Sequence, residues 1–379
     1  MMAANKLTEW LSRVVQIPSV NPSHTGKPEI SGEGRLAAQL VEWFSAFGGE
    51  VHSEDIYPNR PNIYAIWKGQ TDRWVAVDVH TDTVGVAQMS GDPFDGRIAD
   101  GRVYGRGAVD TKATLGVVLA LLETMHQNNL TSQPNILIAA TADEEDGAQS
   151  APIFANWIRK QQIPLSELMV AEPTLCRPVY GHKGGVRLEF TVKGVASHSA
   201  QPHLGKNAIY GAAHAIIALE AEHERLQSLP PATEVGLPTI TVSIINGGIG
   251  GNIVPDTCRF QTGYRMVPGE QQADVVARLE KIVHENCPLP VETQILGGID
   301  PFYQSPDTAW IRQLTEWSGQ TPVTAPYGTN AWAYGDLPGE CVVLGPGSID
   351  QAHGEVEWVE ISELAKLTRI YERWWGISV

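Results

Sequence analysis

Acidic side chains and histidines follow each of four apolar segments of this 379-residue chain. The segments cover residues 74–79, 135–142, 168–171 and 341–344. The polar residues that follow them in chain order are His80 and Asp82, Asp143, Glu144 and Glu145, Glu172, and His353. Imidazole nitrogens and carboxylate oxygens are donors that zinc, cobalt and manganese accept. The pattern therefore indicates a metal site built from several strand ends.

A further acidic residue, Asp110, closes the glycine-containing segment 105–110 and directly precedes an expected helix at 111–127. Alone, such an Asp is typical of a helix N-cap. Likewise, His80 alone is typical of a buried structural histidine, and the Glu144-Glu145 pair alone is typical of a solvated loop. Adjacent carboxylates repel each other, however, and a nearby cation keeps both ionised. Together the residues favour a metal centre over these separate structural interpretations.

The number of candidate ligands favours two metal ions. Two histidines, one aspartate and two glutamates exceed the three protein ligands of a single catalytic zinc ion. Five such ligands suit two ions that share a bridging carboxylate. Ions of this kind polarise a carbonyl oxygen and lower the pKa of a water molecule, which still needs a base. The expected chemistry is metal-assisted hydrolysis.

The segments that carry these residues predict an α/β domain. The four apolar segments are continuously hydrophobic, which is typical of parallel strands buried on both faces. Helices are expected between them, the clearest at 111–127, where Leu115, Val118 and Leu122 share one face. Another amphipathic helix is expected within residues 1–18. Because open α/β sheets bind ligands beyond the carboxyl ends of their strands, the candidate ligands should meet at one edge.

Residues 182–298 predict a second domain with a different pattern. Its expected elements, in the order βαββαβ, are a strand at 186–193, a helix at 207–226, strands at 239–245 and 257–266, a helix at 270–286 and a strand at 291–296. That order is typical of a ferredoxin-like α+β domain. We therefore expect a first domain in two parts, residues 1–181 and 299–379, with a mixed, mostly parallel sheet and helices on both faces. The α+β domain at 182–298 interrupts it.

Composition excludes some classes of partner and site. The formal net charge of −16 disfavours nucleic acid and anionic membranes as partners. No segment reaches the roughly 18 uninterrupted apolar residues of a membrane helix, and we expect a cytoplasmic protein. The four cysteines lie far apart without a Cys-x-x-Cys pair, which disfavours a disulfide framework and a thiolate zinc site. They are Cys176, Cys258, Cys287 and Cys341.

As an ordered set, these motifs resemble the co-catalytic metallopeptidase family of acetylornithine deacetylase, succinyl-diaminopimelate desuccinylase, carboxypeptidase and aminoacylase. The resemblance covers nearly the whole chain. The motifs that carry it are His80-Thr-Asp82, Gly105-Arg-Gly-x-x-Asp110, Asp143-Glu144-Glu145, Glu172-Pro, Ala352-His353, Ser197-His198-Ser199-Ala200 and Gly251-Asn252.

The resemblance implies roles in the first domain. Asp110 would bridge two metal ions, most simply zinc, with cobalt or manganese as alternatives. His80 and Glu172 would complete one metal site, and Glu145 and His353 would complete the other.

Two further residues of that domain receive roles from the resemblance. Glu144 would be the general base that takes a proton from water and returns it to the leaving nitrogen. Asp82 would orient His80 by accepting its second ring N–H.

The resemblance also implies roles in the inserted domain, which would be a lid through which two copies form a homodimer. His198 would donate a hydrogen bond to the developing oxyanion, commonly in the partner's site. Asn252 and Arg265 would hold the carboxylate of the substrate, the arginine through a bidentate pair. A salt bridge at a strand end is an open alternative for Arg265.

The motifs narrow the substrate to a class. Residues 344–353 and 178–184 resemble acetylornithine deacetylase, whereas 198–203 resemble the desuccinylase. Asn330 stands where acetylornithine deacetylases often carry an acid, which makes it a candidate substrate-binding residue and leaves the substrate side chain open. The predicted reaction is cleavage of the amide bond of a small N-acyl amino acid.

Other activities remain open as alternatives. A dipeptidase, a carboxypeptidase or a succinyl-diaminopimelate desuccinylase would use the same metal centre. A binding module without catalysis is opposed by the presence of every expected ligand and the base. A phosphate-ester hydrolase would need cationic groups that the motifs lack.

Overall fold

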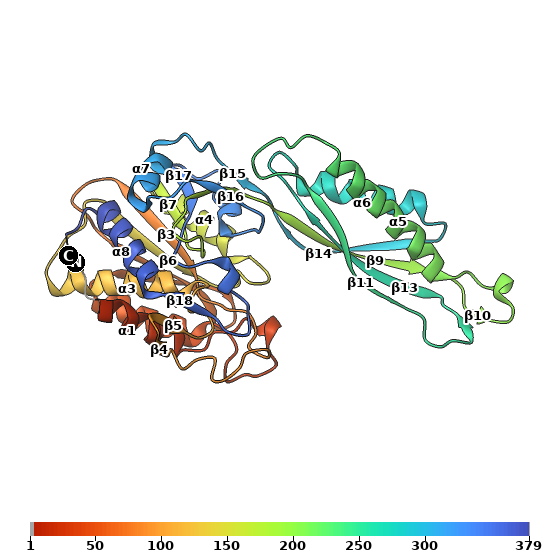
Figure 1. Ribbon diagram of the computed structural model, residues 1–379, viewed down its shortest axis with the longest axis horizontal. Helices are drawn as coiled ribbons and strands as arrows, with labels where there is room; N and C mark the ends of the chain where they lie inside the picture. The colour runs from red at the N-terminus through yellow and green to blue at the C-terminus, as the bar shows by residue number, and fades with distance from the viewer. Residues whose placement is uncertain (1–3, 379) are drawn as a thin grey trace. The chain divides into compact units, whose positions relative to one another are not determined.

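The computed structural model describes residues 4–378, which divide into two compact units. The first unit contains the described residues up to Tyr180, Gln304–Val323, and those from Thr329 onward. The second unit contains Gly181–Tyr303 and Thr324–Gly328. In Figure 1 the second unit is the part coloured mainly green to cyan.

The first unit is built on a mixed sheet whose centre is parallel. The strands are β1 (Glu50–Tyr57), β2 (Arg60–Trp67), β6 (Asn135–Thr141), β3 (Trp74–His80), β7 (Leu165–Val170), β17 (Glu340–Val343) and β8 (Val179–His182), in that spatial order. The four central strands, β6, β3, β7 and β17, run parallel to one another. They correspond to the four apolar segments of the sequence, so the predicted sheet is confirmed. The antiparallel strands β1 and β2 at one edge were not predicted.

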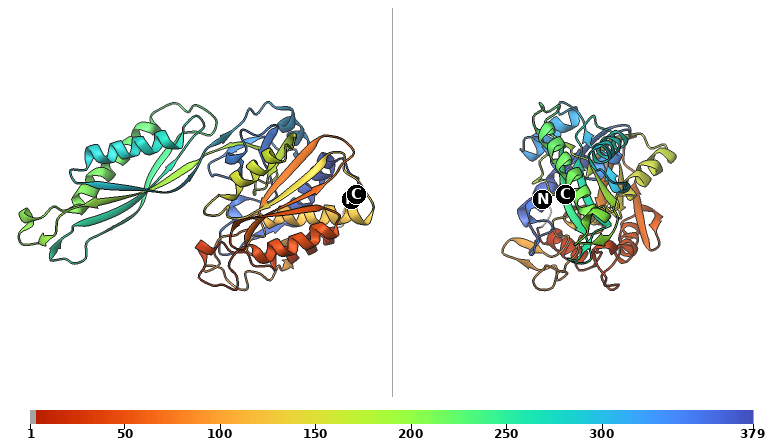
Figure 2. Two further views of the ribbon diagram at one scale, coloured as in Figure 1. Left: turned by 180° about the vertical axis from the view of Figure 1, so that it is seen from behind. Right: turned by 90° about the vertical axis from the view of Figure 1, so that its right-hand side faces the viewer.

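Helices cover both faces of this sheet, as predicted (Figures 1 and 2). They are α1 (Ala4–Val15), α2 (Gly34–Ala46), α3 (Lys112–Gln127), α4 (Ser150–Lys160), α7 (Ala309–Ser318) and α8 (Ile361–Trp375). Val75, Val77 and Val79 of β3 join one core cluster with side chains of α1, α2, α3, α7 and α8. On the opposite face, Tyr64 of β2 stacks on Phe154 of α4. Strand side chains alternate between faces, so Ala76, Asp78 and His80 belong to the α4 side.

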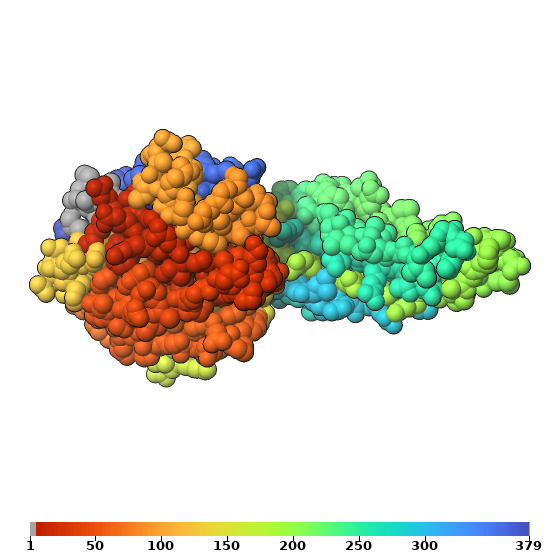
Figure 3. Space-filling model, turned by 90° about the horizontal axis from the view of Figure 1, so that it is seen from below, coloured from red at the N-terminus to blue at the C-terminus, as the bar shows by residue number. Residues whose placement is uncertain are grey.

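Short elements complete the first unit. A small antiparallel sheet contains β4 (Ile98–Ala99), β5 (Arg102–Tyr104) and β18 (Trp358–Glu360). The 3₁₀ turns are η1 (Pro22–His24), η3 (Asn330–Ala333) and η4 (Ile349–Gln351). The strand β16 (Val323–Ala325), which begins in the first unit and continues into the second, pairs with β8. Figure 3 shows one face of this unit, where the N-terminal segments coloured red to orange form much of the surface.

The second unit has the predicted ferredoxin-like order. Its elements are β9 (Gly185–Lys193), α5 (Ala208–Gln227), β11 (Thr239–Gly247), β13 (Thr257–Arg265), α6 (Gln272–Asn286) and β14 (Val291–Ile299). The strands form an antiparallel sheet in the order β11-β13-β9-β14. Val186, Leu188, Phe190 and Val192 of β9 pack against the two helices. A two-stranded ribbon of β10 (Ser197–His198) and β12 (Ile253–Val254), the turn η2 (Pro202–Leu204) and the strand β15 (Phe302–Tyr303) complete this unit.

Two composition-based expectations can be compared with the structure. All four cysteines are buried and free, as expected for reduced thiols. Within residues 4–378, no helix combines the length and the apolar character that crossing a bilayer requires.

Candidate metal centre

The candidate ligands lie at the carboxyl edge of the parallel strands. His80 is the last residue of β3 and is level with Thr141 at the end of β6. Glu172 follows β7 by two residues, and His353 lies in the segment after β17. Parallel strands place such residues at the same edge of a sheet, which is where open α/β sheets bind ligands.

Asp110 lies between two histidines. Its Oδ1 is 3.1 Å from Nε2 of His80, and its Oδ2 is 3.2 Å from Nε2 of His353. The same His353 nitrogen is 3.2 Å from Oε2 of Glu145. Each oxygen of one carboxylate therefore faces a different imidazole, which is the arrangement that a carboxylate bridging two metal ions requires.

The ligand atoms form two overlapping groups. Atoms of His80, Glu144 and Glu172 lie within 4.8 Å of one another, and so do atoms of His80, Asp110 and Glu145. The structure thus gathers into one cluster the five predicted ligands and the predicted base. Among these residues only His353 has a substantially exposed side chain, at 50%.

The electrostatics of the cluster fit divalent cations. Burial, the largest cause, together with neighbouring carboxylates raises the pKa of Glu144 to about 8 and that of Glu145 to about 7. Burial and the same neighbours raise the pKa of Glu172 well above its usual value. Oε1 of Glu145 is buried without a hydrogen-bond partner among the described residues. Buried carboxylates of this kind need a positive charge, and the mixed N/O donor set suits zinc, cobalt or manganese.

Neighbouring carboxylates also raise the pKa values of the two histidines. Hydrogen bonds to Asp110 and Glu145 raise the pKa of His353 to about 10. At His80, burial opposes the charged form, but the hydrogen bond to Asp110 and the nearby carboxylate of Asp82 raise its pKa well above the usual value. Burial also opposes ionisation of Asp110, yet hydrogen bonds from His353 and His80 hold its pKa well below the usual value. A cation would replace the protons that the metal-free cluster holds.

Asp82 contacts His80 mainly through its backbone. Nδ1 of His80 is 3.0 Å from the carbonyl oxygen of Asp82 and 3.6 Å from its Oδ1. The Asp82 carboxylate instead accepts the backbone N–H groups of Glu144 and Glu145, at 3.0 and 3.1 Å. Asp82 therefore links the β3 end to the turn that carries the predicted base, beyond the orienting role expected from the sequence.

Glu357 and Arg106 support the segment of Asp110, and sequence reasoning did not select them. Oε1 of Glu357 accepts the backbone N–H groups of Val109 and Asp110 at 3.0 and 3.2 Å. Its Oε2 accepts Nη1 of Arg106 at 2.6 Å, and both side chains are fully buried. The only signal in the sequence was the Gly-Arg-Gly run around Arg106, since nothing in the residues near Glu357 points to this contact.

Asn330 lies in a buried polar network below the strand ends. Its Nδ2 is 3.4 Å from Oγ1 of Thr141, which in turn donates to Asp78 at 2.7 Å. The hydroxyl of Tyr334 donates to the other oxygen of Asp78 at 2.6 Å. Oδ1 of Asn330 is buried without a hydrogen-bond partner among the described residues. That acceptor is available for a donor that the polypeptide does not supply.

The remaining predicted residues belong to the second unit and are exposed. His198 and Asn252 lie together, because β10 pairs with β12 and the N–H of Ser199 donates to the carbonyl of Asn252 at 3.0 Å. Arg265 is the last residue of β13. The first residue of β13, Thr257, pairs with Lys193, which ends β9 shortly before His198 in the sequence. Nine-residue β13 spans about 26 Å. Arg265 is therefore at the opposite end of the second unit's sheet from His198 and Asn252.

Comparison with known proteins gives a consistent family and fold. A model of peptidase family M20/M25/M40 matches residues 76–376. The acetylornithine deacetylase of Myxococcus xanthus is 32% identical over 284 residues, which cover 72% of each chain. The acetylornithine deacetylase of Aliivibrio salmonicida is 28% identical over 369 residues and 95% of each chain.

Solved structures share the fold over almost the entire chain. An M20 family metallo-carboxypeptidase from Sulfolobus solfataricus superposes with a TM-score of 0.80 at 17% identity, covering 98% of this chain and 99% of that one. Human carnosine dipeptidase 1 superposes with a TM-score of 0.72 at 15% identity, covering 97% and 98%. At these identities the structural matches support the architecture.

Proposed function

Because this chain belongs to peptidase family M20/M25/M40, whose members include metal-dependent amidohydrolases, we propose that it removes the acyl group from a small N-acyl amino acid. The observation that carries the proposal is the cluster at the sheet edge, in which Asp110 faces His80 with one oxygen and His353 with the other. Relatives named acetylornithine deacetylase over most of the chain support the substrate class.

We assign two divalent cations to the cluster, with zinc first and cobalt or manganese as alternatives. Asp110 would contact both ions, His80 and Glu172 would hold one of them, and Glu145 and His353 would hold the other. When bound, such ions polarise the scissile carbonyl and make a water molecule more acidic. The unpartnered Oε1 of Glu145 and the shared position of Asp110 support this assignment.

Glu144 is the general base in this proposal. Its backbone N–H is fixed by Asp82, and its carboxylate lies within 4.8 Å of the ligand atoms of His80 and Glu172. A carboxylate so placed accepts a proton from the attacking water and returns it to the leaving nitrogen.

His198, Asn252 and Arg265 are the proposed substrate contacts of the second unit. His198 donates to the developing oxyanion, and Asn252 and Arg265 bind the carboxylate. The full length of β13, about 26 Å, separates Arg265 from the end of the sheet near His198 and Asn252, so one subunit cannot apply all three to one small substrate. We therefore assign His198 and Asn252 to the site of the partner subunit in a homodimer.

The edge of the second unit's sheet supports a homodimer. Strand β11 is an edge strand and exposes Ile244 and Ile245, while α5 exposes Tyr210 and Ile217. Exposed apolar side chains on an unpaired edge favour association with another chain. Light scattering on the purified protein tests this assignment, and Ile245→Asp should shift a dimer toward monomer. A monomeric active wild type would contradict the partner role of His198.

Asn330 offers a buried hydrogen-bond acceptor without a charge, so it does not by itself select a basic side chain in the substrate. The substrate panel described below identifies that side chain. Dipeptide or C-terminal peptide cleavage and desuccinylation are the competing activities. Four buried free cysteines agree with the reducing cytoplasm that we propose as its location.

A substrate panel tests the proposed reaction. Metal-depleted protein would be assayed with and without zinc, cobalt or manganese against N-acetylornithine, N-acetylcitrulline, N-acetylmethionine, N-succinyl-diaminopimelate and a dipeptide. Metal-dependent acetate release from one substrate is the expected result. Dipeptide cleavage alone would reassign the enzyme to the peptidases, and succinate release alone would reassign it to the desuccinylases.

A further inference from the structure

Three consecutive backbone N–H groups in the turn after β6 donate hydrogen bonds to buried carboxylates. The N–H of Asp143 donates to Oε1 of Glu33 at 3.1 Å. The next two, of Glu144 and Glu145, donate to the two oxygens of Asp82. The backbone that carries the proposed base and a proposed metal ligand is therefore held by two carboxylates from other parts of the chain.

Arg60 joins the first of these carboxylates to the turn. Its Nε and Nη2 donate to both oxygens of Glu33, at 2.6 and 2.8 Å, and Nη2 also donates to Oδ1 of Asp143 at 2.9 Å. Asp143 accepts two further hydrogen bonds, from Asn21 at 3.1 Å and from Tyr57 at 3.1 Å. Arg60 thus contacts both Glu33 and the residue immediately before the base.

The conformation of Asp143 depends on these contacts. Its φ is +62°, in the left-handed region that residues with a side chain seldom adopt. Such a backbone persists when its surroundings over-determine it. The Asp143 N–H is fixed by Glu33, and its carboxylate is fixed by Arg60, Asn21 and Tyr57, so the turn cannot relax without breaking several bonds.

Arg60 supplies the positive charge that both Glu33 and Asp143 contact. The side chains of Glu33 and Asp143 are 0% and 4% exposed, and that of Arg60 is 13% exposed. Both buried carboxylates contact the same guanidinium, so its removal would leave each of them without a cationic partner. A lysine could not reproduce the fork that spans Glu33 and Asp143.

We propose that the Glu33–Arg60 pair is a positioning device, which sets the backbone of residues 143–145 so that Glu144 reaches the water and Glu145 reaches its metal ion. The proposal rests on the proposed function for the role of Glu144. It also extends the site into a part of the chain, before residue 76, that lies outside the family match.

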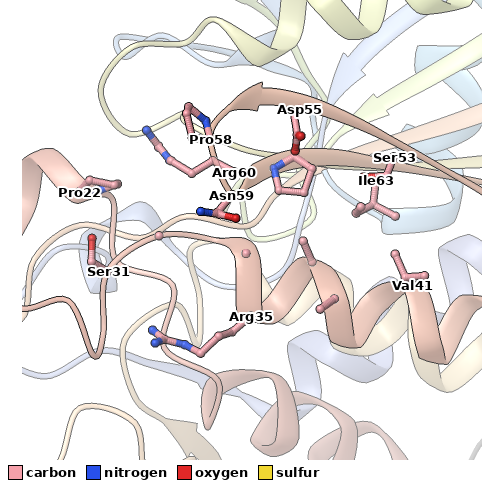
Figure 4. Close-up of a pocket in the computed structure, with 15 residues that line it drawn as sticks. Pro22, Ser31, Arg35, Val41, Ser53, Asp55, Pro58, Asn59, Arg60 and Ile63 are labelled. Carbon is pink, nitrogen blue, oxygen red and sulfur yellow. The ribbon is translucent and has the colours of Figure 1, made fainter.

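A cavity beside Arg60 makes the proposal testable by chemical rescue. The cavity has a volume of about 610 Å³ and lies between the start of α2 and the β1–β2 turn. Figure 4 shows Arg60, Asn59 and Pro58 on one side of it and Arg35 on α2. Removal of the Arg60 side chain would open the Glu33 carboxylate toward this cavity. A guanidinium ion from solution could then occupy the vacated position.

The test compares Arg60→Ala, Arg60→Lys and Arg73→Ala. Arg73 also forms a double hydrogen bond with a glutamate, Glu167, but at the opposite end of the parallel strands. For each variant, kcat, KM, the affinity for zinc in a chelator competition and the melting temperature would be measured. Guanidinium chloride at tens of millimolar would be compared with sodium chloride at equal ionic strength.

The expected result is a loss of about 10–100-fold in kcat or in zinc affinity for Arg60→Ala, with KM little changed. Guanidinium should restore at least part of the kcat or zinc affinity that Arg60→Ala loses. Arg60→Lys should be nearly as impaired as Arg60→Ala, and Arg73→Ala should have the kcat and zinc affinity of the wild type. A lower melting temperature with wild-type kcat and zinc affinity in the folded protein would overturn the proposal. Full activity in Arg60→Lys, or no recovery by guanidinium, would also overturn it. Zinc affinity reports on the device even if no substrate of the panel is cleaved, so the two proposals fail separately.

Discussion

The candidate residues of the first unit and those of the second unit differ in how firmly the polypeptide holds them. At the sheet edge, the side chains of Asp110 and Glu145 are each 6% exposed, and other side chains fix the backbone N–H groups of these residues. In the second unit, His198, Asn252 and Arg265 are exposed. The only hydrogen bond found for these three side chains within the described unit is the one His198 accepts from the N–H of Ala200.

This difference separates two tasks. Metal ions and a general base need fixed geometry before the substrate arrives, because misplacement of the reacting groups is costly to the rate. Groups that hold a carboxylate or an oxyanion can gain their partners from the substrate itself. We therefore expect substitutions at the sheet edge to affect kcat and metal binding, and substitutions in the second unit to leave metal binding intact.

The largest expected effect is that of Glu144→Gln. The amide keeps the shape of the side chain but cannot accept the proton, so kcat should fall by about 10²–10⁴-fold. Both metal ions should remain bound, as measured by elemental analysis of the purified protein. Asp146→Asn, at an exposed position in the same turn, is the control and should retain activity. Substantial turnover by Glu144→Gln would remove this residue from the role of base.

The second test, His198→Ala, concerns the exposed candidate residues of the second unit. Loss of one hydrogen bond to the developing oxyanion should lower kcat by about 10²–10³-fold. Metal content and zinc affinity should not change, because His198 belongs to the other unit. His203→Ala, in the following turn, is the matched control. If kcat is unchanged in His198→Ala, oxyanion stabilisation must come from elsewhere.

Arg265→Ala should act on binding. A charge-assisted hydrogen bond contributes about 1.5–3 kcal/mol, which corresponds to a KM increase of roughly 10–150-fold. The metal content and the melting temperature should stay close to those of the wild type. Arg225→Ala removes an exposed arginine that pairs with Glu222 on α5 and should leave KM unchanged. An unchanged KM for Arg265→Ala would remove this residue from the proposed substrate contacts.

The sequence predicted the centre of the fold because burial leaves a direct trace in composition. Strands β3 and β6 are buried on both faces, and their residues are almost uniformly apolar. Strand β1 lies at the sheet edge and alternates exposed with partly buried positions, with Glu50, Glu54 and Asp55 among them. Its polar sequence gave no strand signal, although its partner β2 is largely buried.

The candidate ligands were visible for a similar reason, since each follows an apolar strand or precedes a helix. Their supporting residues were not visible. Glu33 meets Asp143 across 110 positions, and Glu357 meets Asp110 across 247. Neither glutamate has a local spacing that distinguishes it from a surface residue, because its partner is defined only by the tertiary fold. The contact of His80 with the carbonyl rather than the carboxylate of Asp82 likewise depends on side-chain geometry that spacing cannot predict.

The smallest expected effect concerns the pH dependence of metal affinity, and it tests why the sheet edge is fixed. In the metal-free protein, burial raises the pKa of Glu145 to about 7 and that of Glu144 to about 8, and hydrogen bonds raise that of His353 to about 10. These groups hold protons below those values, and a metal ion must displace the protons of its ligands. Zinc affinity should therefore fall as the pH is lowered, by about tenfold per pH unit for each proton released. Competition with a chelator from about pH 6 to pH 8 would measure how zinc affinity changes with pH, with the chelator's own protonation taken into account.

Arg265→Ala should show the same pH dependence of zinc affinity as the wild type, since its side chain belongs to the second unit and the candidate metal ligands belong to the first. A flat profile would mean that the cluster is already ionised without metal, and that the buried carboxylates are stabilised by something other than the cations proposed here.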